Sequence, residues 1–222
     1  MDTPRIKDWM ASQGINLPEA VYEQMAQFQS LVLTANETMN LTAITSNEDF
    51  AVKHFIDSLS LLPLLPAPHT ERALSLLDVG TGAGFPGVPL KIARGDLDVT
   101  LLDSTRKRLD FLRDALGKLG LDAEYIHARA EEWPRQMPGR KFDIVTARAV
   151  ARLDKLLGYT LPLVKTGGYF YAMKGSDVGQ EIEEARAALK KHRAKIEKTV
   201  SVQLTPDMTH TVIVIRKDVS HV

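Results

Sequence analysis

The sequence contains no cysteine among its 222 residues. This absence excludes a disulfide framework, a zinc site built on thiolates and a cysteine nucleophile. No segment approaches the roughly 20 apolar residues that a membrane-spanning helix needs, and the opening residues M-D-T-P-R-I-K-D-W-M lack the apolar centre of a signal peptide. We therefore expect a cytoplasmic protein that does not associate with a membrane, and we predict no metal site.

The chain also lacks net charge, because 28 basic residues balance 28 acidic ones. A neutral chain is not expected to bind nucleic acid strongly without specificity. The charges are unevenly divided, however, since the first 75 residues carry 4 basic and 9 acidic side chains. Either the acidic and basic parts face different partners, or the division is ordinary surface variation.

Apolar side chains recur at helical spacing over residues 18–35, and again from residue 47 to about residue 62. The proline-rich stretch L-P-L-L-P-A-P-H ends this helical part, because proline removes a helix donor. We expect a helical extension over residues 1–70 and an α/β domain over residues 71–222.

Beyond the prolines, short apolar strands alternate with amphipathic helices, which predicts a doubly wound, mostly parallel sheet of seven strands. The last two strands, separated by T-P-D-M-T, predict an antiparallel hairpin. This is the Rossmann-like architecture of class I methyltransferases. Helices are expected at residues 105–119 and 177–192, and strands at residues 74–79, 99–103, 124–127, 142–147, 168–173, 199–204 and 210–217.

A glycine-rich loop, D-V-G-T-G-A-G-F-P-G, follows the first predicted strand and begins at Asp78. Gly80, Gly82 and Gly84 let the backbone turn tightly and approach a ligand at the carboxyl edge of the sheet. The pattern G-x-G-x-x-G that starts at Gly82, with Asp103 lying 21 residues later, also fits a dinucleotide-binding site. The loop alone therefore leaves open an NAD-dependent oxidoreductase and a methyltransferase.

Two further features favour S-adenosyl-L-methionine over NAD. A carboxylate at Asp78 suits a cationic ligand such as the methionine amino group and would repel a pyrophosphate. Ala130 and Glu131 follow the third strand, and the fifth strand reads V-K-T-G-G-Y-F-Y-A-M-K-G, both of which recur in methyltransferases. Asp103 is the candidate ribose ligand, although a carboxylate in its place can also cap the next helix, as Ser104 or Thr105 can.

Catalytic residues that the sequence lacks narrow the choice of the atom that accepts the methyl group. Methylation of pyrimidine C5 needs a cysteine adduct, and enzymes acting on exocyclic amino groups usually carry an Asn/Asp-Pro-Pro-aromatic tetrad where this chain reads T-A-R-A at residues 146–149. Guanine N7 has an exposed in-plane lone pair and needs no general base, so no catalytic base is predicted. Arg148, at the ligand edge of the fourth strand, is a candidate contact for the cofactor, the base or a phosphate, or a surface residue.

Six segments together carry a resemblance to a known family. They are M-N-L-T-A-I at 39–44, K-H-F-I-D-S-L at 53–59, L-D-V-G-T-G-A-G-F-P-G-V-P-L at 77–90, L-L-D-S-T-R-K-R at 101–108, H-A-R-A-E-E at 127–132 and F-D-I-V-T-A-R-A-V at 142–150. The chain resembles the RsmG family (glucose-inhibited division protein B) of bacterial 16S ribosomal RNA guanine-N7 methyltransferases. The resemblance implies methylation in the decoding-region loop on the small ribosomal subunit, and cofactor contacts at Gly80, Phe85, Asp103, Ser104, Thr105, Ala130, Glu131 and Arg148.

Asn40, His54, Arg148 and Lys174 are the candidate substrate contacts. Asn40 is either a turn residue or a partner of the target base, and His54 either packs between helix and sheet or lines the substrate pocket. Basic residues that are candidate RNA contacts cluster at 106–108, at 135, 140 and 141, and at 190–198. A small-molecule methyltransferase, an NAD-dependent oxidoreductase and a non-catalytic RNA-binding module remain alternatives, and a monomer is expected.

Overall fold

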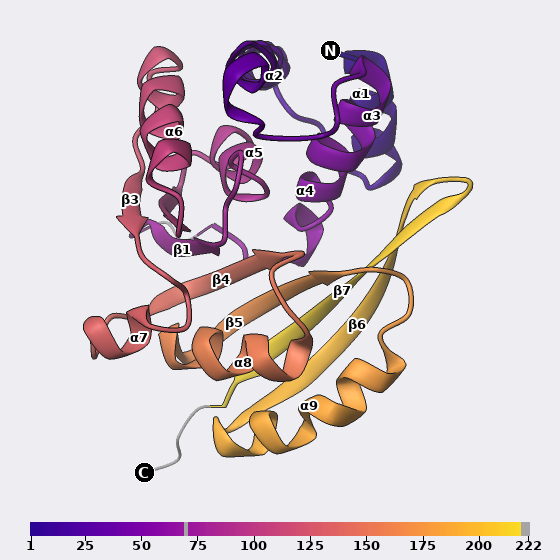
Figure 1. Ribbon diagram of the computed structural model, residues 1–222. Coiled ribbons are helices and arrows are strands. Elements are labelled where there is room, and N and C mark those ends of the chain that lie inside the picture. Colours follow the sequence, from indigo (N-terminus) through magenta and orange to yellow (C-terminus); the bar gives the residue numbers. More distant parts are fainter. Residues whose placement is uncertain (69–70, 219–222) are drawn as a thin grey trace.

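The computed structural model describes residues 1–68 and 71–218 (Figure 1). Its strands are β1 (Leu74–Val79), β2 (Leu97–Asp103), β3 (Glu124–His127), β4 (Phe142–Arg148), β5 (Val164–Lys174), β6 (Ala194–Thr205) and β7 (Met208–Lys217). Its α-helices are α1 (Thr3–Ser12), α2 (Glu19–Met39), α3 (Asn47–Phe50), α4 (Asp57–Leu59), α5 (Gly87–Ala93), α6 (Arg106–Lys118), α7 (Trp133–Gln136), α8 (Leu153–Thr160) and α9 (Gly179–Lys191). A π-helical segment η1 (Ala51–Ile56) and 3-10 turns η2 (Leu62–Leu64) and η3 (Leu161–Leu163) complete them.

The seven strands form one sheet in the order β3-β2-β1-β4-β5-β7-β6. The pairs β1–β2, β1–β4, β2–β3 and β4–β5 are parallel, whereas β7 pairs antiparallel with β5 and β6. The order reverses at β1 and β4, so the carboxyl ends of these strands border the crevice where doubly wound sheets bind ligands. The predicted sheet and its terminal hairpin are confirmed.

Helices cover both faces of the sheet (Figure 1). Alternate residues of the central strands point to opposite faces, so Leu76 packs with α5, α6 and the N-terminal helices, whereas Leu77 packs with α8 and α9. Phe28 and Phe55 from the N-terminal helices belong to the same buried cluster as Leu76. The helical extension is therefore built onto one face of the sheet and shares its core.

The proposed domain boundary near residue 70 stays a prediction, and residues 69–70 lie outside the described residues. No helix in the described ranges is long and apolar enough to cross a membrane.

The helix predicted from residue 47 to about 62 differs from the structure. The helical run ends at Leu59, its central part is the π-helical segment η1, and only a 3-10 turn follows at Leu62–Leu64. Single π turns widen a helix by one residue and are common beside functional sites. Helix α1 lies within the predicted helical extension but was not predicted as a separate element, and β5 and β6 begin four and five residues before the predicted starts at 168 and 199. Glu197, Lys198 and Thr199 near the start of β6 are all exposed, and this run interrupts the alternation of apolar and polar residues that identifies a strand.

Candidate functional site

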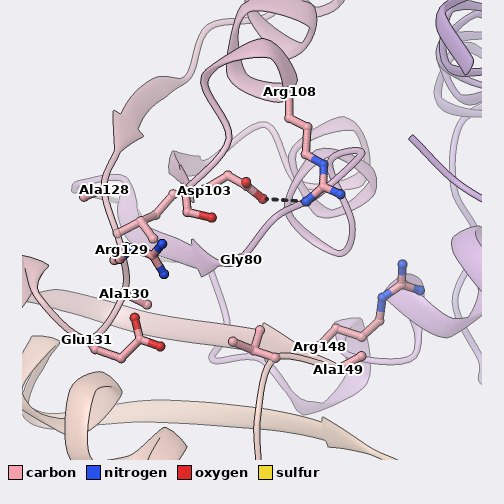
Figure 2. Close-up of a pocket in the computed structure, with 12 residues that line it drawn as sticks. Gly80, Asp103, Arg108, Ala128, Arg129, Ala130, Glu131, Arg148 and Ala149 are labelled. Atoms are coloured by element: carbon pink, nitrogen blue, oxygen red, sulfur yellow. Dashed lines mark ion pairs between the residues drawn. The ribbon is translucent and has the colours of Figure 1, made fainter. Parts of the chain in front are cut away.

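A cavity of about 230 Å³ opens at the carboxyl edge of the sheet, where β1, β2 and β4 end and the loop after β3 passes (Figure 2). It lies at the topological switch point that the sheet order defines. The ends of β2 and β4, the start of α6 and the loops after β1, β2, β3 and β4 converge there. They contribute Gly80, Leu102, Asp103, Ser104, Arg108, Ala128, Arg129, Ala130, Glu131, Arg148, Ala149 and Val150. Six of the predicted site residues are in this group, namely Gly80, Asp103, Ser104, Ala130, Glu131 and Arg148.

Asp103 serves the loops as well as the cavity. Its Oδ2 accepts a hydrogen bond from the Gly82 amide at 2.9 Å, and its Oδ1 accepts one from the Thr105 amide at 2.8 Å. The Arg108 guanidinium lies 3.6 Å from Oδ2. Asp103 therefore holds the glycine loop and the turn into α6 in place. A carboxylate offers about four acceptor positions, so Asp103 can still accept hydrogen bonds from a ligand in the cavity.

Asp78 lies beneath the glycine loop. The side chain is fully buried, and its carboxylate accepts hydrogen bonds from Thr81 Oγ1 at 2.7 Å, the Gly87 amide at 2.9 Å and Thr146 Oγ1 at 3.2 Å. Burial raises the pKa of Asp78. In this geometry Asp78 shapes the loop and does not line the cavity, so its contact with a ligand amine stays a prediction.

The loop residues Gly82, Gly84, Phe85 and Thr105 also lie outside the cavity lining. Gly84 adopts a φ of +103°, and a Cβ there would lie 2.8 Å from atoms of Leu112 and Val88, so glycine is needed for both conformation and space. The Phe85 ring points into the core. Phe85 is 3% exposed and stacks on the His54 ring with centroids 4.3 Å apart. The loop is thus anchored to the N-terminal helices.

Arg148 lines the cavity and also contacts the N-terminal helical segments. Its Nη1 donates to the Lys53 carbonyl at 2.7 Å and to Asp57 Oδ2 at 2.9 Å, and its Nη2 lies 3.2 Å from His54 Nδ1. The guanidinium also lies over the Phe85 ring, 5.5 Å from the centroid. Arg148 is therefore an organised part of the site, and its interpretation as a simple surface arginine is wrong.

His54 is a neutral part of this arrangement. Burial, and next the charge of Arg148, lower the pKa of His54 to about 3. Because Arg148 can only donate, His54 Nδ1 accepts, and Nε2–H donates to Thr42 Oγ1 at 3.0 Å. Both ring nitrogens are occupied and the residue is buried, so the structure gives His54 a packing role against Phe85 and Arg148.

A second cavity, of about 200 Å³, adjoins the first through Arg148 and Ala149. Met173, Lys174, Gly175 and His210 complete its wall. Lys174 forms an ion pair with Glu181 at 2.8 Å. Ala149 has a φ of +54°, which is an uncommon value for a residue with a side chain.

The remaining substrate candidate, Asn40, is exposed and ends α2 with a φ of 50°; it lines neither cavity. Sequence reasoning missed His210, whose Nδ1–H donates to Asp57 Oδ1 at 2.8 Å. These residues are 153 positions apart, so only the tertiary fold brings them together.

The sequence matches the family described as rRNA small subunit methyltransferase G (GidB) over residues 21–210. It is 43% identical over 214 residues to the ribosomal RNA small subunit methyltransferase G of Thermoanaerobacter sp. (strain X514), covering 95% of this chain and 86% of that protein. The chain belongs to this family. The family prediction made from the six segments is confirmed, and membership decides between the methyltransferase and the NAD-dependent oxidoreductase in favour of the former.

Solved structures agree on the fold. A class I S-adenosylmethionine-dependent methyltransferase from Listeria monocytogenes, itself described as putative, superposes with a TM-score of 0.65 at 13% identity, over 90% of this chain and 70% of that one. The magnesium protoporphyrin IX methyltransferase of Synechocystis PCC 6803, solved with bound SAM, gives a TM-score of 0.62 at 14% identity, over 86% and 97%. At such identities the likeness establishes the architecture, and it confirms the predicted class I fold.

Proposed function

We propose that the protein transfers a methyl group from S-adenosyl-L-methionine to N7 of a guanine in the decoding-region loop of 16S ribosomal RNA. Family membership is the observation that carries this proposal. The cavity at the switch point of the sheet supports it, since it offers the chemistry that this cofactor requires. We further propose that the protein acts in the cytoplasm, as a monomer, on the small ribosomal subunit.

The cavity residues fit the parts of the cofactor in order. Asp103 would accept hydrogen bonds from the ribose hydroxyls, and Ala130 with Glu131 would border the adenine. The Gly80 backbone and Arg148 would meet the methionine end, where Arg148 offers a cation for the carboxylate. The bound cofactor supplies an electrophilic methyl group on a sulfonium, and the protein's contribution is to hold the two partners in line.

The second cavity is the proposed site of the target guanine. It shares Arg148 and Ala149 with the first, so a base there would lie beside the methionine end of the cofactor. Met173 offers an apolar surface, and Lys174 and Arg148 offer donors toward a base carbonyl. A base reaches such a pocket only when it leaves its stack, as is usual for RNA that is read at single bases.

No proton transfer is required of the protein. Guanine N7 attacks through its own lone pair, and the adjacent imidazole of His54 is neutral and engaged on both nitrogens. A site without a general base, in which the imidazole next to Arg148 is neutral and fully hydrogen-bonded, is consistent with methylation at guanine N7.

RNA would approach across the rim of the first cavity. Arg106 and Lys107 begin α6 and are exposed, next to Ser104 of the cavity wall, and the exposed Arg129 lines the cavity itself. Such side chains contact phosphates without reading sequence, and they make the affinity depend on salt.

The test is incorporation of a labelled methyl group from S-adenosyl-L-methionine into 16S rRNA, supplied free and within the small subunit, followed by nucleoside analysis. We expect N7-methylguanosine from at least one of the two substrates. RNA that is bound and left unmethylated would favour a non-catalytic RNA-binding module, and methylation confined to small metabolites would favour the small-molecule enzyme.

A further inference from the structure

Asp57 is a buried carboxylate between the two cavities and the N-terminal helices. It begins α4, immediately after the π-helical segment, and is 1% exposed. Both oxygens are engaged, Oδ2 by Arg148 Nη1 at 2.9 Å and Oδ1 by His210 Nδ1 at 2.8 Å. Burying a charge costs several kcal/mol unless partners compensate it, and here β4 and β7 each provide one.

The Arg148 guanidinium has one negatively charged partner in this network. Its other acceptors are neutral, namely the Lys53 carbonyl and His54 Nδ1. Arg148 is 20% exposed, and it belongs to the walls of both cavities. A guanidinium that moved by one ångström there would change the geometry of both sites, and misplacement on this scale slows transfer reactions strongly.

We propose that Asp57 is a positioning residue, which holds Arg148 at the junction of the two cavities, and that His210 is the second partner that keeps the Asp57 carboxylate in place. This inference rests on the proposed methyl transfer, since the placement of Arg148 matters through that reaction. The proposal also gives the π-helical segment a role. Lys53 and His54 lie within this segment and Asp57 directly follows it, and all three contact the Arg148 guanidinium.

The histidine gives a readout that is independent of activity. The hydrogen bond to Asp57 raises the pKa of His210 above 6.5. The charged groups around it are Asp57 on α4, Arg148 on β4 and Lys174 on β5, the last paired with Glu181 on α9. In Asp57→Asn we expect the NMR titration of His210 to shift to lower pH, because the charge that favours the imidazolium is gone.

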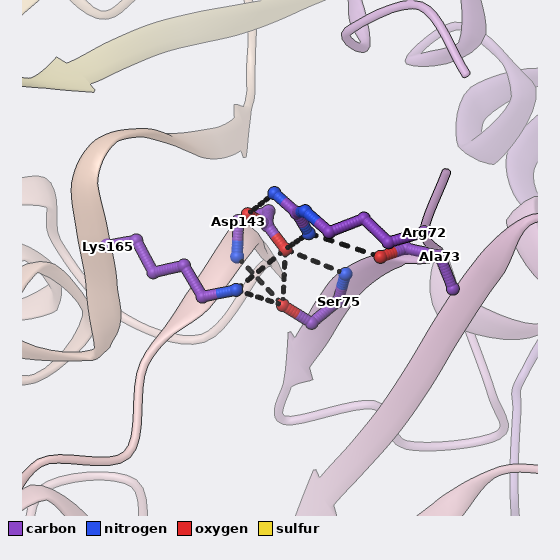
Figure 3. Close-up of polar contacts among 5 residues, drawn as sticks. All are labelled: Arg72, Ala73, Ser75, Asp143 and Lys165. Carbon is purple, nitrogen blue, oxygen red and sulfur yellow. Dashed lines mark hydrogen bonds and ion pairs between the residues drawn. The ribbon is translucent and has the colours of Figure 1, made fainter. Parts of the chain in front are cut away.

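The chain offers a matched control in Asp143 (Figure 3). Asp143 also has two cationic partners, Arg72 Nη2 at 2.8 Å and Lys165 Nζ at 2.9 Å, together with Ser75 Oγ at 2.7 Å. It lies near the start of β4, whereas Arg148 ends the same strand, which separates them by about 17 Å at 3.3–3.4 Å per residue. Asp143→Asn therefore removes a comparable charge far from both cavities.

The experiment compares single-turnover methyl transfer to 16S rRNA at saturating cofactor for wild type, Asp57→Asn and Asp143→Asn. We expect both variants to fold with a lower Tm. The rate of Asp57→Asn should fall about ten-fold or more. The rate of Asp143→Asn should stay within about two-fold of wild type.

A double-mutant cycle distinguishes positioning from general stabilisation. In the Arg148→Lys background, Asp57→Asn should cost less than about two-fold, because a residue that acts through Arg148 loses its effect when Arg148 is changed. Equal rate losses for the two aspartate variants, or independent losses for Asp57 and Arg148, would overturn the positioning role. A wild-type protein that leaves 16S rRNA unmethylated would instead overturn the proposed function.

Discussion

The substitution Gly84→Ala tests how the glycine loop is built. Gly84 has a φ of +103°, well beyond the left-handed well near +57° that side chains tolerate best. An alanine there costs about 1–3 kcal/mol of backbone strain. Its Cβ would also lie 2.8 Å from Leu112 Cδ2 and Val88 Cγ2 and 3.0 Å from Phe28 Cζ, and overpacking of this kind costs about 1–3 kcal/mol.

The combined loss is about 2–6 kcal/mol of unfolding free energy, which corresponds to roughly 4–24 °C in Tm for a chain of this size. Gly120→Ala is the matched control. Gly120 has a φ of +67° and no neighbour within 4 Å of a Cβ, so that variant carries only about 1–2 kcal/mol of strain.

Thermal and urea unfolding of the two variants measure the difference. We expect Gly84→Ala to lose about 2 kcal/mol more than Gly120→Ala, because only Gly84 combines strain with contact. Equal losses in the two variants would refute the claim that the loop is held by its packing against α6 and the N-terminal helices.

Three further predictions concern single sites. The pKa of His54 is about 3 in the folded state and 6.5 in the unfolded one. Between these pH values the unfolded chain binds one proton more than the folded chain, so the free energy of unfolding should fall as pH falls through that window. In urea unfolding, His54→Gln should show a shallower pH dependence of this free energy than wild type, and the same pH dependence in both proteins would contradict the burial of a neutral imidazole. Asp103→Asn should weaken S-adenosylhomocysteine binding about 10- to 100-fold by calorimetry, as expected for hydrogen bonds to a charged acceptor; an unchanged Kd would restrict Asp103 to loop bracing. Replacing Arg106, Lys107 and Arg129 by serine should make the salt dependence of RNA affinity shallower by about 2 to 3 in log–log slope; an unchanged slope would place the RNA elsewhere.

The sheet was predictable because its central strands are apolar on both faces and bounded by turn residues. All seven strands were located, and β1 and β3 were predicted with their exact ends, at residues 74–79 and 124–127. The π-helical segment was not predictable, since K-H-F-I-D-S-L has ordinary helical spacing and the extra residue per turn has no signature in single residues. In the structure, Lys53 within this segment and Asp57 directly after it both contact Arg148.

The residues that line the cavity were predictable where they stand at the ends of strands. They were less predictable where the burial of a side chain determines its direction. Gly80, Asp103 and Arg148 lie in the cavity because the topology brings strand ends together. Asp78 also stands at a strand end, but its carboxylate turns under the loop to meet amide and hydroxyl donors. The direction of a side chain at a turn depends on its hydrogen-bond partners, which the sequence pattern does not reveal. The contact of His210 with Asp57, 153 residues away, could not be predicted for the same reason.

The central claim is methylation of guanine N7 in the decoding-region loop, and mass spectrometry of 16S rRNA tests it most directly. In cells from which the gene for this protein has been deleted, we expect N7-methylguanosine to disappear from that loop and to return when the wild-type gene is restored. N7-methylguanosine that persists undiminished in the deletion strain would contradict the account.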